Sequence, residues 1–170
     1  MRLISFFVVL AATAGAAASN PVQAQGFFID GRVGQSELRD VPGARDDTGF
    51  AVGAGWWFNR NFAVEGGWAD LYSRGYPAGR VALDGFYAGV KGRALFAQRG
   101  DAGFFVGGRG GLYSWTGRAA QLEADGNDWY AGVFTGYQFS NRVALSVNYD
   151  RFRADDLDTD LASVGLEYTF

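Results

Sequence analysis

The chain ends with the stretch Ser163-Val164-Gly165-Leu166-Glu167-Tyr168-Thr169-Phe170. Apolar and aromatic residues alternate in it with small or polar residues, so a β-strand here would have one apolar face and one small or polar face. A strand that closed a dry core would normally be covered, whereas this one finishes on the aromatic ring of Phe170. The alternation therefore predicts an amphipathic strand at this end of the chain.

Seven further stretches alternate in the same way, and the eight predicted strands cover residues 26–36, 48–58, 62–72, 81–93, 102–115, 128–139, 143–151 and 160–170. A tilted strand needs about nine to eleven residues to cross a bilayer, and each stretch is near that length or longer. The connections alternate between long polar segments (37–47, 73–80, 116–127 and 152–159) and the tight turns Asn59–Asn61, Gln98–Asp101 and Ser140–Arg142. This layout predicts an all-β fold, an eight-stranded antiparallel up-and-down transmembrane β-barrel.

The two halves of the chain share a plan. The stretch at 26–34 recurs at 103–111 with six of nine residues identical, and the stretch at 55–64 has a weaker counterpart at 136–145. Duplication and convergence on the same barrel constraints explain this similarity equally well.

The phase of the strands predicts which face meets lipid. In the first strand Phe27, Ile29 and Val33 share one face, while Asp30 and Arg32 lie on the other. A charge facing hydrocarbon is costly, so the charged face must point into the lumen. The inward charges expected from this rule are Asp30, Arg32, Glu65, Lys91, Arg109, Asp150 and Glu167, with Arg93 near one end. Asp70 and Asp84 fall on the outward phase and are expected at the outer rim.

Two further patterns support a membrane barrel. The lumen of an eight-stranded barrel is just wide enough for side chains, so the inward glycines (Gly53, Gly55, Gly89, Gly107, Gly111, Gly132 and Gly136) are expected to make room for long charged residues. Aromatic residues gather near the tight turns (Trp56, Phe58, Phe62, Phe104, Tyr137, Phe139, Tyr168 and Phe170) and near the long connections (Trp68, Tyr72, Trp115, Trp129, Tyr130 and Tyr149), which predicts two interfacial belts. The alternative, a soluble lipocalin-type barrel, would point its aromatics inward and carry charge outside.

The ending resembles the C-terminal recognition signal of bacterial outer-membrane β-barrels, in which a polar residue and a glycine precede two aromatics. Those positions are Ser163, Gly165, Tyr168 and Phe170 here. The resemblance implies that the barrel-assembly machinery reads the last strand. From residue 25 onward the chain resembles the small OmpA-like and OmpX-like family, without a peptidoglycan-binding domain. It implies a location in the outer membrane of a Gram-negative bacterium, with lipids and lipopolysaccharide as partners.

The first 24 residues read as a signal peptide. Arg2 is followed by an uncharged apolar stretch, Pro21 breaks it, and small residues end at Ala24. We expect cleavage there, leaving residues 25–170 as the barrel domain; the alternative is an uncleaved membrane anchor.

Composition narrows the function. After the expected cleavage, residues 25–170 hold 14 basic and 18 acidic side chains, because Arg2 is the one charged residue removed. The resulting net charge of −4 argues against a nucleic-acid partner. Cysteine and histidine are both absent, which removes thiol and imidazole chemistry, so we expect no enzyme activity and no cofactor. The acidic spacing from Asp156 to Glu167 mimics a calcium loop, but Leu161 stands where that loop needs glycine, so no metal site is expected.

Two functions remain. We expect a structural or cell-surface binding role, with inward charges that pair because an unpaired buried charge is costly. The alternative is a narrow gated channel in which the same ion pairs rearrange to pass small solutes or ions. Outer-loop arginines (Arg39, Arg45, Arg74, Arg80 and Arg118) suit phosphate contact, although solvated surface charge explains them equally well.

Overall fold

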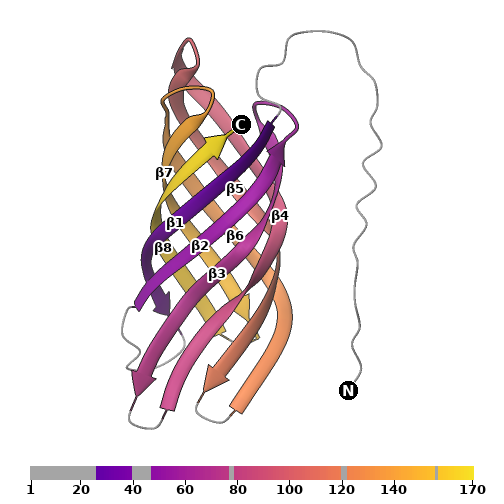
Figure 1. Ribbon diagram of the computed structural model, residues 1–170, viewed down its shortest axis with the longest axis vertical. Coiled ribbons are helices and arrows are strands. Elements are labelled where there is room, and N and C mark those ends of the chain that lie inside the picture. Colours follow the sequence, from indigo (N-terminus) through magenta and orange to yellow (C-terminus); the bar gives the residue numbers. More distant parts are fainter. Residues whose placement is uncertain (1–25, 40–46, 77–78, 120–121, 156) are drawn as a thin grey trace.

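A closed barrel forms the whole of the described chain. The structure is a computed structural model that describes residues 26–39, 47–76, 79–119, 122–155 and 157–170. Its strands are β1 (Gly26–Leu38), β2 (Asp47–Trp57), β3 (Phe62–Tyr76), β4 (Gly79–Arg99), β5 (Ala102–Ala119), β6 (Leu122–Gln138), β7 (Val143–Ala154) and β8 (Leu157–Thr169). Neighbours pair antiparallel, and β1 pairs with β8 to close the sheet (Figure 1). The predicted fold is confirmed.

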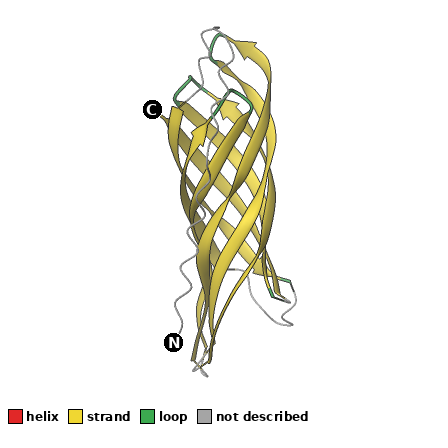
Figure 2. Ribbon diagram, turned by 90° about the vertical axis from the view of Figure 1, so that its right-hand side faces the viewer, coloured by secondary structure: helices red, strands yellow, loops and turns green. Residues whose placement is uncertain are grey.

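The strands are long and strongly tilted, and the described residues form only strands and short connections (Figure 2). Within them, no helix is long and apolar enough to cross a membrane. The C-terminus, the start of β1 and the tight turns lie together at one end, which we call the turn end; the opposite end is the loop end (Figure 1). The predicted signal peptide, residues 1–24, lies outside the described residues.

Three of the four connections that we expected to be long are hairpins, so that part of the prediction was wrong. Strand pairing continues to Tyr76↔Gly79, to Ala119↔Leu122 and to Ala154↔Leu157. These segments are rich in polar residues, but backbone N–H and C=O groups need hydrogen-bond partners whatever the side chain, and for the described residues of these segments the neighbouring strand supplies them. At the fourth connection β1 ends at Leu38 and β2 begins at Asp47, and residues 40–46 lie outside the described residues.

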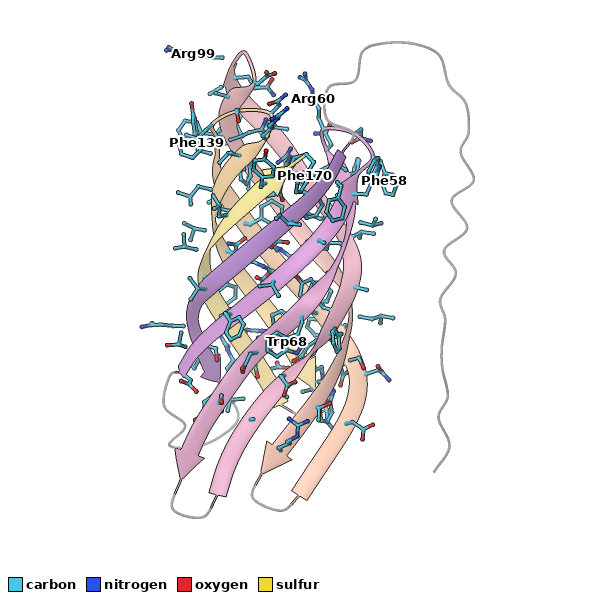
Figure 3. The ribbon with its side chains drawn as sticks, viewed as in Figure 1. Phe58, Arg60, Trp68, Arg99, Phe139 and Phe170 are labelled. Carbon is cyan, nitrogen blue, oxygen red and sulfur yellow. The ribbon has the colours of Figure 1, made fainter. Side chains whose placement is uncertain are left out.

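The outer wall is apolar, as the phase predicts, and the lumen holds the inward charged side chains together with buried aromatic and aliphatic ones. Phe27, Ile29 and Val33 are 44–57% exposed on β1, whereas Phe28 and Arg32 are at most 3% exposed. Phe58, Phe139 and Phe170 project outward near the turn end, while Trp68 lies farther toward the loop end (Figure 3). The wall thus presents its apolar face to the surroundings, which suits a lipid environment.

Three aromatics that we assigned to the loop-end belt point into the barrel instead. Tyr130 and Trp115 occupy the inward phase of β6 and β5, so their position along the strand was a poorer guide than their phase. Tyr72 is inward because the β3–β4 register shifts between Asp70 and Tyr72, which places both Leu71 and Tyr72 inside. Trp129 and Tyr149 remain outside, each 41% exposed.

The outward carboxylates lie where they were expected. Asp70 pairs in register with Asp84, and Asp84 precedes the 69% exposed Phe86 by two residues toward the loop end. Asp84 also forms an ion pair of 3.5 Å with Arg118, which is outward on β5. A polar rim therefore follows the apolar band on this side.

The inward glycines lie where a larger side chain would clash with neighbouring atoms. A methyl group added at any of the seven predicted positions would approach another atom to between 1.9 and 2.4 Å. At Gly111 the nearest atoms are the Ala88 carbonyl oxygen and the Gly89 Cα, which are backbone and cannot rotate away. The glycines allow bulky inward residues to share a narrow lumen.

Candidate functional site: the filled lumen

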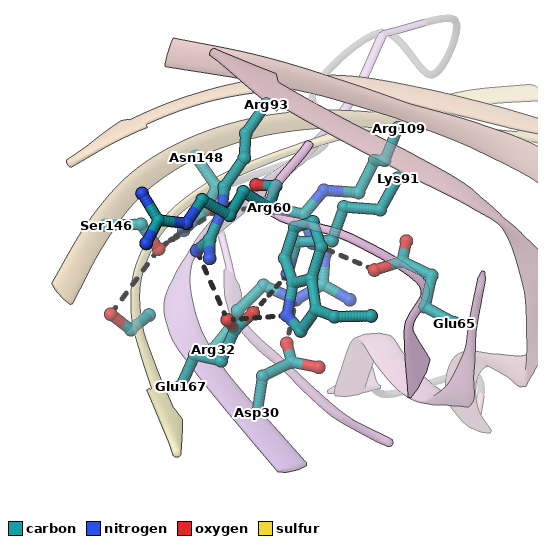
Figure 4. Close-up of polar contacts among 12 residues, drawn as sticks. Asp30, Arg32, Arg60, Glu65, Lys91, Arg93, Arg109, Ser146, Asn148 and Glu167 are labelled. Carbon is teal, nitrogen blue, oxygen red and sulfur yellow. Dashed lines mark hydrogen bonds and ion pairs between the residues drawn. The ribbon is translucent and has the colours of Figure 1, made fainter. Parts of the chain in front are cut away.

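Eight charged side chains occupy the middle and turn-end part of the lumen, and we call them the lumen charge cluster. They are Asp30, Arg32, Glu65, Lys91, Arg93, Arg109, Asp150 and Glu167, contributed by β1, β3, β4, β5, β7 and β8. The four acidic residues balance the four basic ones. In the close-up most of these side chains converge from the surrounding strands on one region (Figure 4).

The first half of the cluster centres on Asp150, which is fully buried. Its Oδ2 is 2.8 Å from Arg32 Nη1, and its Oδ1 is 3.3 Å from Arg109 Nε. Arg32 also lies 3.2 Å from Asp30, and Arg109 lies 3.9 Å from Glu65. The two arginines occupy equivalent positions in the repeated stretches at 26–34 and 103–111, and they meet on one carboxylate.

The second half centres on Glu167, near the turn end. Its carboxylate accepts a hydrogen bond of 2.6 Å from Lys91 Nζ and one of 3.1 Å from Trp57 Nε1. Arg93 lies 3.6 Å from the same carboxylate and stacks 4.0 Å from the Trp57 ring. These contacts link the last strand across the lumen to β2 and β4.

Toward the loop end, packed rings cross the lumen above the charges. Tyr87 (β4), Tyr113 (β5), Tyr130 (β6) and Phe152 (β7) form this aromatic layer, with ring centroids 5.0–6.4 Å apart and at most 2% of each residue exposed. Leu71, Tyr72 and Leu161 pack against them from β3 and β8. Two hydroxyls face the charges: Tyr130 donates to Glu65 at 2.9 Å, and Tyr87 accepts from Arg32 at 2.6 Å.

The arrangement leaves little space inside. A small cavity beside the charge cluster is lined by Arg32, Lys91, Arg109, Asn148 and Glu167 among others, and it is large enough only for water molecules. A second space at the turn end is lined by Trp57, Arg60 and Arg93 among others. Arg93 borders both spaces. No group of three or more acidic side chains suited to a metal ion occurs among the described residues.

All seven lumen charges singled out from the sequence are at most 9% exposed, and the structure brings them together. Phase alone did not identify their uncharged partners. Tyr87, Tyr130 and Trp57 share the inward phase of their strands, and an inward aromatic with a polar group was the available signal. Asn148, which accepts a hydrogen bond of 2.5 Å from Arg109, carried the same phase signal.

Three of the predicted assembly-signal residues lie on β8, and the fourth, Phe170, follows that strand directly. Ser163 and Gly165 are inward, while Tyr168 and Phe170 are outward and 36% and 66% exposed. The Tyr168 and Phe170 rings are 5.0 Å apart, and Phe27 of β1 lies 5.7 Å from Phe170. Among the outer-loop arginines, Arg39 and Arg118 are exposed, Arg45 lies outside the described residues, and the side chains of Arg74 and Arg80 are likewise not described.

Comparison with known proteins identifies the family. The family model of the outer membrane protein beta-barrel domain matches residues 5–170 of this chain. The chain belongs to this family. It is therefore an outer-membrane protein, and the resemblance to small OmpA-like and OmpX-like barrels is confirmed. A search of curated proteins found no match.

Solved structures with the same fold include neisserial surface protein A (TM-score 0.61, 16% identity, 85% of this chain and 97% of that chain). They also include the attachment invasion locus protein Ail of Yersinia pestis, in complex with the heparin analogue sucrose octasulfate (TM-score 0.53, 12% identity, 86% and 97%). A de novo designed transmembrane β-barrel matches as well (TM-score 0.51, 14% identity, 86% and 96%). At these identities the similarity shows the fold alone, and a designed barrel among them illustrates that the fold does not specify a function.

Proposed function

We propose that this outer-membrane protein is a non-conducting barrel with a structural or cell-surface binding role. The observation that carries the proposal is the aromatic layer. Tyr87, Tyr113, Tyr130 and Phe152 contact one another across the lumen, and no more than 2% of any of them is exposed. A solute would have to separate the packed rings and also displace the ion pairs around Asp150. Separating a buried ion pair is costly, because each charge then lacks its partner.

With the lumen filled, the chain's outer wall and loop end are the surfaces left for binding. In this proposal outer-membrane lipids and lipopolysaccharide are the partners of the wall, the loop-end connections hold any further surface ligand, and the barrel carries no enzyme activity. The Ail structure contains a bound polyanion, sucrose octasulfate, which gives one precedent for ligand binding by a barrel of this fold. The barrel-assembly machinery is the proposed partner during biogenesis.

Osmotic swelling of vesicles tests the proposal. Vesicles that contain the purified, folded protein should swell no faster in glycine or L-arabinose than protein-free vesicles, while vesicles that contain an open porin swell rapidly. The alternative is a gated channel, and there the substitution of Arg109 by Ala should change the rate of swelling. Arg109 borders the cavity and contacts both Glu65 and Asp150. Faster swelling by the unmodified protein would overturn the non-conducting role.

The gated channel remains the second candidate because Arg93 borders both internal spaces. Movement of this one side chain from the Trp57 ring would join the turn-end space to the cavity. The aromatic layer would still separate that cavity from the loop end, so a channel requires a second movement. That requirement makes the non-conducting role the better supported of the two.

A further inference from the structure

Two arginines meet on the outer wall rather than in the lumen. Arg151 on β7 and Arg39, directly after β1, both reach Asp160 on β8, and all three residues lie on the outward phase. Arg151 Nε is 2.7 Å from Asp160 Oδ1, and Arg39 Nε is 2.5 Å from Asp160 Oδ2. Tyr149 donates a hydrogen bond of 2.5 Å to the same Oδ2. One carboxylate therefore orders two guanidinium groups and a phenol on the surface.

The arginines keep donors available. Each uses Nε and Nη2 in contacts with Asp160 or Tyr149, and among the described residues the Nη1 group of each has no hydrogen-bond partner. The side chains of Arg39 and Arg151 are 51% and 32% exposed, whereas that of Asp160 is only 6% exposed beneath them. The hydrogen bond to Asp160 raises the pKa of Arg39 above its ordinary value, so this group stays charged.

The cluster lies next to the apolar band. Tyr149 pairs in register with Ala162, and the next outward-facing pair toward the turn end is Val147↔Val164, both more than 50% exposed. Tyrosines of membrane barrels occupy the level of the lipid headgroups, so guanidinium groups just beyond Tyr149 meet the lipid phosphates. Arginine forms bidentate contacts with phosphate, which suits a pair of neighbouring forks.

We propose that Arg39 and Arg151, held by Asp160 and Tyr149, bind the phosphate monoester headgroup of a lipid in the surrounding leaflet, with its acyl chains along Val147 and Val164. The site deepens the proposed binding role and rests on it, but it does not depend on whether the lumen conducts. Glu37 pairs in register with Asp160 and is exposed on the same face. Its negative charge opposes an anionic headgroup and limits the affinity.

Lipid binding to the purified, folded barrel in detergent tests the site. Native mass spectrometry would compare phosphatidic acid, a phosphate monoester, with phosphatidylcholine of the same chain length. The unmodified protein should retain phosphatidic acid selectively. The double variant R39A/R151A should bind it about tenfold more weakly, which corresponds to about 1.4 kcal/mol. The matched control R99A/R142A removes the same charge from exposed turn-end positions and should leave binding unchanged.

Three further variants separate an ordered site from general attraction. R39K/R151K keeps both charges but loses the forks, and it should bind more weakly than the unmodified protein. Asp160→Ala adds net positive charge but frees the arginines, so weaker binding supports the ordered site and stronger binding overturns it. Glu37→Gln should strengthen binding because it removes a like charge.

Equal loss in R39A/R151A and R99A/R142A would overturn the proposal, because net charge would then explain the binding. Inorganic phosphate at the same concentration should not displace the lipid, since it has no acyl chains to lie along Val147 and Val164. Displacement would show a phosphate site without a lipid and would overturn the lipid assignment. Folding of every variant is checked by its shift on SDS gels before and after boiling. None of these outcomes bears on the swelling experiment, so the two proposals fail separately.

Discussion

Removal of Arg32 should destabilise the barrel strongly. The side chain of Arg32 is 1% exposed, and it lies 3.2 Å from Asp30 and 2.8 Å from Asp150. The variant Arg32→Met keeps much of the volume and removes the charge. Asp150 retains Arg109 at 3.3 Å, whereas Arg32 is the one ion-pair partner that the described residues give Asp30. One buried carboxylate is thus left uncompensated.

Breaking a buried ion pair by removal of one partner costs about 3–5 kcal/mol, and the lower end applies here because Asp150 is still paired. The loss in the free energy of unfolding should therefore be about 3 kcal/mol. The double variant Asp30→Asn/Arg32→Met restores the balance of charge, with three acidic and three basic residues in the lumen charge cluster. It should regain most of the loss, because removal of both partners leaves no stranded charge.

Denaturant unfolding in lipid vesicles, followed by tryptophan fluorescence, measures these differences. The control Arg142→Met removes an exposed charge at a tight turn and should change the free energy by less than about 0.5 kcal/mol. Small and equal effects at Arg32 and Arg142 would contradict a buried, paired Arg32, since they would show that water solvates the lumen charges. A double variant no more stable than Arg32→Met would contradict the specific pairing with Asp30.

Three further outcomes are expected. Gly111→Ala should destabilise the barrel by about 1–3 kcal/mol in the same unfolding assay, because the added methyl group overpacks against backbone atoms. The control Gly31→Ala has nothing within 4 Å of its added methyl group and should be nearly neutral. Equal effects of the two substitutions would show that the lumen has room for the added group. Deletion of Phe170 should sharply lower outer-membrane levels in cells while the purified variant still folds into lipid, and normal cellular levels would contradict the assembly-signal hypothesis. Mass spectrometry of outer-membrane material should show a chain that begins at Gln25, and a chain that retains residues 1–24 would contradict the proposed cleavage.

The sequence predicted the fold and the lumen charges because both follow from the two-residue alternation of side chains along a strand. In a barrel, alternate residues face lipid, and charge facing lipid is too costly to occur in the apolar band. Phe27 and Arg32 could therefore be placed on opposite faces from the sequence alone. The same rule identified the inward glycines, because a filled lumen needs small residues beside large ones.

Other features depend on information that the period does not hold. The β3–β4 register shift placed Tyr72 inside, and a single extra residue of this kind leaves no clear mark in the sequence. The partners of each charge depend on how strands are staggered around the barrel, so the meeting of Arg32 and Arg109 on Asp150 could not be predicted. The six strands β3 to β8 were predicted too short at the loop end because polar residues beyond the membrane still pair across strands.

Current recording across a planar lipid bilayer shows directly whether the filled lumen conducts. The inserted, folded protein should give no steady conductance, because the aromatic layer and the ion pairs around Asp150 fill the lumen. Neutralising substitutions at Glu65 or Arg109 serve as the comparison. A steady conductance of the unmodified protein that changes when Glu65 or Arg109 is neutralised would contradict a filled, non-conducting lumen and identify the protein as a channel.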